Sequence, residues 1–294
     1  MAKMIPLWFF LALGSSACSA LGVYMHQRLG GTNAATAVWL KILAVALAAP
    51  VLWQTGLPTH PLFYLFTAGA ALIWCYNDLV YFEAVKNHGG ALVARLSPLG
   101  LILGFIAWFA IKPELLGRYL EDTPRFLGIC ATLLLTVGCT IFLKRCAVSW
   151  MALKAIWPII IAAAIGIICL KSAVDYAPED QGVFGYIGFE ASLMLAFYGL
   201  YFTLRRHSGW KDVFSRAGWR SGSVAGGLLL LGVVLRTYAF QSVDHPAFVT
   251  MIAMLDVVWL MILSRLSGWK DGSNKIATLG IVLAALALAF LKIR

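Results

Sequence analysis

Charged side chains recur inside the long apolar runs of this sequence. Between residues 77 and 98, Asp78, Glu83 and Arg95 lie within a few turns of a polar bend, with an apolar run on either side. A charged group at the centre of a bilayer costs about 3 kcal/mol even on a mild insertion scale, so it normally faces a cavity or an opposite charge. The pattern therefore indicates a path for a solute or an ion through a membrane.

Two carboxylates lie deeper along their apolar runs. Glu190 is about ten residues into one run and Asp256 about eleven residues into another, which at about 1.5 Å per residue places both near the bilayer centre. Burial disfavours the ionised form, so Asp256 could bind and release a proton as a cavity changes its exposure. The alternative is a carboxyl group that is neutral or paired in a helix interface. We assign proton coupling to Asp256, Glu190 and Glu83.

Lys41 is opposite in sign to Glu190, and two interpretations of this pair are open. It could be a structural ion pair, or it could separate in one state to bind the two ends of a zwitterion. Arg95 and Arg236 either extend to lipid phosphates or bind a carboxylate or phosphate of a solute through the guanidinium fork. Asp78 could also form a simple pair with Arg95.

Aromatic residues lie beside these buried charges. Tyr81, Tyr238 and Trp259 are most simply packing residues, but a few of them could stack on an organic substrate or cover a cation. The predicted substrate-binding set is therefore Lys41, Asp78, Tyr81, Arg95, Glu190, Arg236, Tyr238 and Trp259.

The composition is that of a membrane protein with several spans. Of the 294 residues, 61% are hydrophobic and 12% are charged, and the mean hydropathy is +0.85. A soluble domain carries about a quarter charged residues and could not keep so much apolar surface from water. The net charge of +10 comes mainly from short loops, where it would meet anionic lipid. No aromatic and basic interleaving of the nucleic-acid kind is present, so a nucleic-acid partner is not expected.

The cysteines do not form a metal site. The six are scattered through apolar segments without a Cys-x-x-Cys pair or a histidine at ligand spacing, so we expect small buried hydrophobes. No nucleotide-binding loop is present either. We therefore expect no metal, no cofactor and no direct use of ATP.

Apolar runs of roughly twenty residues, each long enough to cross a bilayer, occur ten times. They lie near residues 5–25, 34–54, 61–84, 89–111, 124–143, 152–175, 181–204, 220–241, 245–267 and 274–292. The first run could pass for a signal peptide, but its apolar character continues through Tyr24, so we interpret it as a span. Basic residues outside the runs fall mainly after the odd-numbered ones, and the positive-inside rule then places both termini outside.

Segments of the second half resemble segments of the first. Residues 81–91 and 236–246 each pass from an aromatic-rich helix end through a short polar bend, and residues 126–129 (Phe-Leu-Gly-Ile) resemble 278–281 (Thr-Leu-Gly-Ile). An odd number of spans per half makes the second copy enter the membrane from the opposite face. We predict an all-α membrane protein with ten transmembrane helices arranged as two inverted five-helix repeats, residues 1–147 and 148–294.

Three short segments carry a resemblance to a known family. Residues 84–86 (Ala-Val-Lys) lead to 96–98 (Leu-Ser-Pro), and 112–115 (Lys-Pro-Glu-Leu) follow the fourth run. With the two five-helix halves, they resemble the drug/metabolite transporter superfamily, in particular its ten-helix members with two EamA-type domains. Pro98 matches the proline that those domains usually carry in the fourth helix, and Glu114 stands near their customary glutamate.

The second half departs from this pattern, because Ala253 replaces the proline and residues 267–271 offer no clear glutamate. The resemblance implies a carrier of amino acids, nucleotide sugars, sugar phosphates, quaternary amines or lipid-linked groups, without naming the solute. It also implies termini in the cytoplasm, opposite to the charge distribution, and we keep the prediction from the charges.

The leading hypothesis is a secondary active transporter that works by alternating access, coupled to protons, for a small polar or amphipathic organic solute such as an amino acid or organic anion. A flippase for a phospholipid or a polyprenyl-phosphate-linked group is the alternative. A membrane-embedded transferase is a further alternative, but neither His88 nor His245 has a nucleophile at suggestive spacing, so we do not expect an enzyme.

The expected partners are protons, membrane lipids and a small organic solute or lipid-linked substrate, in a bacterial inner membrane. Small residues at helical spacing, Gly100 with Gly104 and Gly222 with Gly226, favour close helix contacts within one chain or between two. A monomer and a homodimer are therefore both open.

Overall fold

Every element that the structure describes is a helix. The computed structural model describes residues 6–30, 32–88, 99–142, 150–204, 209–268 and 274–293. The helices are α1 (Leu7–Leu29), α2 (Asn33–Thr55), α3 (Pro61–His88), α5 (Leu99–Ile111), α6 (Pro113–Glu121), α7 (Thr123–Ile141), α8 (Trp150–Asp175), α9 (Glu179–Leu204), α10 (Gly209–Phe214), α11 (Arg216–Gln241), α12 (Pro246–Ala253), α13 (Asp256–Leu266) and α14 (Lys275–Ile293).

Seven spans among the described residues are long and apolar enough to cross a membrane: α1, α2, α7, α8 from Ile156 onward, α9, α11, and α12 with α13 taken together. Helices α5 and α6 would count as an eighth only if taken as one span, although they are bent by 105°. The prediction of an all-α integral membrane protein is therefore confirmed. The count of ten spans stays a prediction, and part of the expected fourth span, 89–98, lies outside the described residues.

Helix ends follow from local hydrogen bonding. The side chains of Thr32 and Ser215 accept the backbone N–H groups of Ala35 and Gly218 at 3.2 and 2.9 Å, which caps the starts of α2 and α11. At its other end, α1 stops at Gly30, whose φ of 66° lies in the left-handed region that glycine adopts without strain.

His245 also caps a helix, but its side chain is buried. Its Nδ1 accepts the N–H of Ala247 at 3.2 Å, its Nε2 lies 3.2 Å from the carbonyl of Phe105, and Pro246 supplies the first residue of α12. The ring is fully buried and lies 4.6 Å from the ring of Phe105, centroid to centroid. We therefore assign this histidine a structural role at the start of α12.

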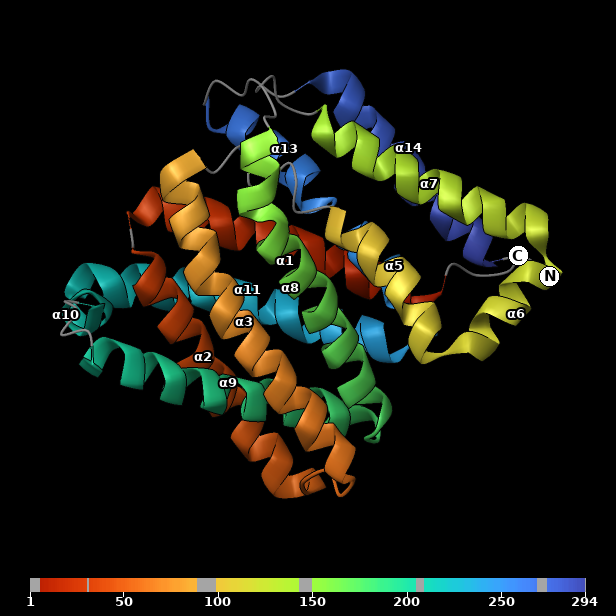
Figure 1. Ribbon diagram of the computed structural model, residues 1–294. Coiled ribbons are helices and arrows are strands. Elements are labelled where there is room, and N and C mark those ends of the chain that lie inside the picture. The colour runs from red at the N-terminus through yellow and green to blue at the C-terminus, as the bar shows by residue number, and fades with distance from the viewer. Residues whose placement is uncertain are drawn as a thin grey trace.

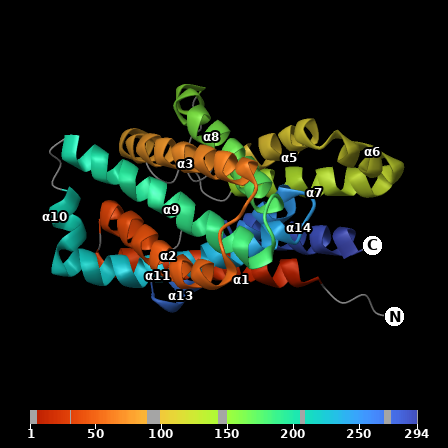
Figure 2. The same cartoon turned by 90° about the horizontal axis from the view of Figure 1, so that it is seen from below.

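Helices distant in the sequence pack side by side (Figures 1 and 2). Helix α1 packs on α11, α3 on α8, α2 on both α9 and α11, and α7 on α14. Gly222 and Gly226 allow the close contact of α11 with α2, because a Cβ atom at either position would lie about 3 Å or less from Trp39 or Leu40. The predicted role of this glycine pair is thus confirmed within one chain.

The two ends of the bundle differ. Helix α6, the start of α1 and the end of α14 lie at one end, and α10 lies at the other (Figures 1 and 2). Helix α6 is amphipathic: Leu115 is buried on one side while Arg118 is exposed. A helix of this kind, turned away from the preceding span, suits the interface between lipid and water.

Candidate functional site

Helix α2 places Lys41 inside the bundle. The chain begins α2 at the Thr32 cap, and Lys41 follows eight residues after Asn33, about 12 Å along the helix. Helix α9 faces α2 and carries Glu190 eleven residues, or about 17 Å, from its start. Both side chains therefore lie well inside their helices, away from the helix ends.

Lys41 and Glu190 form an ion pair between α2 and α9. The Lys41 Nζ lies 2.8 Å from both carboxylate oxygens of Glu190, and the two side chains are only 14% and 8% exposed. Removing two charges from water is costly, and their attraction offsets that cost only when the contact is close. Breaking this pair without supplying substitutes would leave an uncompensated charge in the bundle.

Asp78 of α3 extends this contact into a polar cluster. The hydroxyl of Tyr198, on α9, donates a hydrogen bond to Asp78 Oδ2, and the charges of Lys41 and Glu190 both act on the Asp78 carboxylate. Lys41, Asp78, Glu190 and Tyr198 are called the Lys41 cluster from here on. The residue before Asp78 is Asn77, whose buried Oδ1 has no hydrogen-bond partner among the described residues.

Arg236 lies in a second cluster, formed by α1, α11 and α13. Its Nε donates to Ser15 Oγ at 3.2 Å and its Nη2 to Ser19 Oγ at 3.1 Å. Trp259 Nε1 donates to Ser16 Oγ at 3.0 Å on the same face of α1. Ser15, Ser19, Arg236, Asp256 and Trp259 are called the Arg236 cluster, in which neutral hydroxyl groups hold the cation.

The charges of Asp256 and Arg236 act on each other, but the two described side chains do not form an ion pair. Within the described ranges, no side chain donates a hydrogen bond to the Asp256 carboxylate; its one hydrogen bond is to the backbone N–H of Val257. Asp256 begins α13 about 15 Å into the span that starts at Pro246. An acid without a side-chain partner at this depth is suited to exchanging a proton.

A helix interruption places Asp256 at a helix N-terminus. Helix α12 ends at Ala253 and α13 begins at Asp256, and the N–H groups of Val257 and Val258 bond to carbonyl groups three residues back rather than four. The positive end of the α13 dipole therefore points at the Asp256 carboxylate. Interrupted helices at mid-membrane depth are where transporters build ion and substrate sites.

The other predicted site residues lie apart or outside the described part. Tyr238, two residues after Arg236 on α11, donates a hydrogen bond to Asp180 at the start of α9 and makes no hydrogen bond or ion pair with either cluster's charged groups among the described residues. Arg95 lies outside the described residues, and the side chains of Tyr81 and Glu83 are not described. The structure thus brings Lys41, Asp78 and Glu190 together, and separately brings Arg236, Asp256 and Trp259 together. In the ranges described, no hydrogen bond or ion pair joins the two clusters.

Several contributors were not predicted. Ser15 and Ser19 carry no charge and lie in an ordinary small-residue stretch of α1. Tyr198 was only one aromatic residue among many, and no Gly or Pro marks the interruption at Met254 and Leu255. Ser15 and Ser19 are four residues apart and so share one face of α1. This spacing is the sequence signal that could have indicated a polar face for a buried arginine.

Polar contacts also close the end of the bundle where α8 meets α9. Asp175 forms an ion pair with Lys171 one turn earlier, and its Oδ2 lies 3.0 Å from the Nζ of Lys112, which joins α5 to α6. Gln181 donates to the carbonyl of Thr55, which ties α9 to the end of α2. No group of three or more metal-ligating side chains occurs in the ranges described.

Comparison with known proteins gives no family for this chain. No protein-family model matches it, and no curated protein matches it significantly. The resemblance to the drug/metabolite transporter superfamily therefore stays a prediction from the short segments named above.

Proposed function

We propose that this protein is a secondary active transporter that works by alternating access and couples proton movement to the transport of a small zwitterionic or anionic organic solute. The observation that carries the proposal is the Lys41–Glu190 ion pair, buried between α2 and α9 with two equal contacts of 2.8 Å. A pair of this kind can release its partners to the ends of a zwitterion and re-form when the site is empty. The function is transport across the bilayer, not catalysis.

Helix pairing supports the inverted repeat within this proposal. If α1, α2 and α3 correspond to α8, α9 and α11, then the contact of α1 with α11 has its counterpart in that of α8 with α3. The contact of α2 with α11 likewise corresponds to that of α9 with α3, and α2 with α9 is its own counterpart. The Lys41–Glu190 pair then joins equivalent helices across the repeat axis, where transporters place their sites. Ten spans and membership of the drug/metabolite transporter superfamily belong to the same proposal.

The two clusters supply complementary groups for such a solute. The Lys41 cluster offers carboxylates and an ammonium group, whereas the Arg236 cluster offers a guanidinium fork that suits a carboxylate or phosphate. Asp256, without a side-chain partner among the described residues, is the proposed proton carrier. The solute would contact the ammonium, carboxylate and guanidinium groups of the two clusters. Asp256 would change its exposure to water between the transport states.

Orientation is part of the proposal. The end of α1, α10 and the start of α11 lie at the end of the bundle opposite α6 (Figures 1 and 2), and these segments carry Arg28, Lys211 and Arg220. The positive-inside rule then places this end in the cytoplasm and the start of α1 outside, in a bacterial inner membrane.

Purified protein in proteoliposomes with an imposed pH gradient tests the function. A thermal-shift screen of amino acids, amines, phosphorylated metabolites and lipid phosphates selects the solute, and the uptake of that solute is then followed. We expect accumulation that collapses when the gradient is dissipated. If a polyprenyl phosphate moves and no water-soluble solute does, the carrier proposal is replaced by a flippase.

A further inference from the structure

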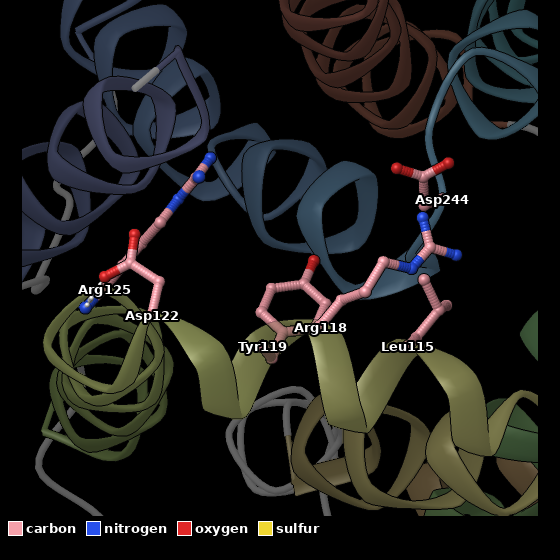
Figure 3. Close-up of a pocket in the computed structure, with 6 residues that line it drawn as sticks. All are labelled: Leu115, Arg118, Tyr119, Asp122, Arg125 and Asp244. Carbon is pink, nitrogen blue, oxygen red and sulfur yellow. Dashed lines mark hydrogen bonds between the residues drawn. The ribbon is translucent and has the colours of Figure 1, made fainter.

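A polar pocket lies against α6 (Figure 3), and none of its lining residues belongs to the Lys41 or the Arg236 cluster. Its volume is about 160 Å³, and its lining includes Arg118, Tyr119 and Asp122, together with Arg125 of α7 and Asp244, which precedes α12. Two guanidinium groups, two carboxylates and a phenol thus face one small space, so the pocket contains full charges of both signs and is neutral in sum.

The pocket is held in shape by the surrounding helix ends. The Nε of Arg125 donates to the carbonyl of Leu291, near the end of α14, at 2.8 Å. Asp122 accepts the backbone N–H of Arg125 at 3.3 Å, which caps α7. Tyr119 packs its ring 5.7 Å from Phe109 and 6.0 Å from Phe126. The charged groups are therefore carried on anchored backbone at the end of the bundle.

The hydroxyl group of Tyr119 is available in this pocket as a hydrogen-bond donor. Burial, together with the nearby charge of Asp244, raises the pKa of Tyr119 to about 12, although the charges of Arg125 and Arg118 lower it. The hydroxyl therefore keeps its proton at neutral pH. Figure 3 shows it pointing to the side of α6 on which Asp244 lies.

An apolar groove of about 600 Å³ runs along the other side of the same aromatic residues. It is lined by α5, α6 and α7, and two of its lining residues, Phe109 and Phe126, pack against the ring of Tyr119 in the pocket. Ile106 and Leu134 line it and are each 61% exposed, so the groove opens toward lipid. A charged pocket at the level of α6 thus borders an apolar groove that extends toward the bilayer interior.

We propose that this pocket and groove bind one phospholipid with a phosphoethanolamine headgroup, its phosphate between Arg118 and Arg125 and one acyl chain in the groove. Charge complementarity selects the occupant. Guanidinium groups and a phenol suit the phosphate, whereas two carboxylates suit an ammonium group with three donors, which a quaternary amine lacks. The site is independent of the transport proposal.

Lipid retention measured by native mass spectrometry tests the site. Purified protein is titrated with dioleoyl phosphatidylethanolamine, phosphatidylcholine or phosphatidylglycerol. We expect the ethanolamine lipid to be retained most strongly. Equal or stronger retention of phosphatidylglycerol would overturn the headgroup assignment, because the carboxylates would then play no part.

Variants separate the two charged halves of the pocket. Arg118→Gln should weaken retention of the ethanolamine lipid about tenfold, the equivalent of one charge-assisted hydrogen bond. The matched control is Arg220→Gln, an exposed arginine at the opposite end of the bundle, which should change nothing. Asp244→Asn should remove the preference for ethanolamine over glycerol headgroups. Unchanged retention in Arg118→Gln overturns the proposal.

The groove is tested by filling it. Ile106→Trp should weaken retention of the long-chain lipid, whereas Leu286→Trp, at an exposed position of α14 outside the groove, should not. Glycerophosphoethanolamine, which lacks acyl chains, should compete at least tenfold less well than the lipid. If it competes equally, the groove contributes no binding and the ligand is a soluble phosphate ester.

Discussion

The Lys41 and Arg236 clusters each contain a cationic side chain and a carboxylate, but the hydrogen-bond partners of these groups differ. In the first, the ammonium group meets a carboxylate at 2.8 Å, and a further carboxylate accepts a tyrosine hydroxyl. In the second, the guanidinium is held by two serine hydroxyls, and Asp256 has no side-chain partner among the described residues. In the Lys41 cluster the charged groups pair with each other. In the Arg236 cluster the guanidinium group and the Asp256 carboxylate do not form an ion pair.

This difference has consequences for stability and for function. A buried pair couples two charges so strongly that removing one strands the other. A carboxylate without a partner adds little to stability, so its persistence in a costly position needs another explanation. Mutations should therefore affect folding most in the Lys41 cluster, whereas in the Arg236 cluster they should affect proton coupling.

The largest loss is expected for Glu190→Gln. It leaves the Lys41 ammonium without its counter-charge, and breaking a buried pair typically costs about 3–5 kcal/mol. The free energy of unfolding in detergent measures the loss. Glu179→Gln, at the exposed start of the same helix, serves as the control. A loss no larger than that of the control would show that the pair is energetically unimportant.

Tyr198→Phe should cost less, about 2 kcal/mol, because it removes one hydrogen bond to a charged acceptor while keeping the ring. Thermal unfolding detects the change. Tyr76→Phe, on the exposed side of α3, is the matched control. If both variants unfold alike, the Asp78 contact contributes nothing to the Lys41 cluster.

Ser19→Ala should cost about 1 kcal/mol, since Arg236 loses one hydrogen bond of 3.1 Å to a neutral hydroxyl and keeps Ser15. The same unfolding assay applies, with Ser223→Ala on α11 for comparison. A loss as large as that of Glu190→Gln would mean that the two clusters are equally dependent on their partners, which contradicts the comparison.

Asp256→Asn should have the smallest effect on unfolding, under about 1 kcal/mol, because no side-chain hydrogen bond among the described residues is lost. Uptake driven by a pH gradient should nevertheless fall more than tenfold, as the amide cannot carry a proton. Glu114→Gln, on the exposed α6, is the control for neutralising a carboxylate. Unchanged pH dependence of uptake would remove Asp256 from the coupling role.

Much of the charge placement could be predicted from the sequence. The opposite signs of Lys41 and Glu190, each well inside an apolar run, indicated a possible pair, and the structure forms it. The sequence did not predict that Asp78 would turn to Tyr198, or that Asp256 would lie in a different cluster from Glu190. Which faces of α3, α9 and α13 meet depends on helix rotation and on residues scattered over the whole chain, so no local pattern reveals it.

The sequence by itself determined that the chain is helical and lies in a membrane, because so many apolar residues in long uninterrupted runs leave no other way to satisfy the backbone. It also indicated that Lys41 and Glu190 lie inside the bundle. Only the tertiary structure decided which charged groups meet. Serines of α1 hold an arginine of α11, and an interruption without Gly or Pro at Met254 and Leu255 leaves Asp256 unpaired among the described side chains. The physical reason is that hydropathy depends on each residue alone, whereas pairing depends on the packing of whole helices.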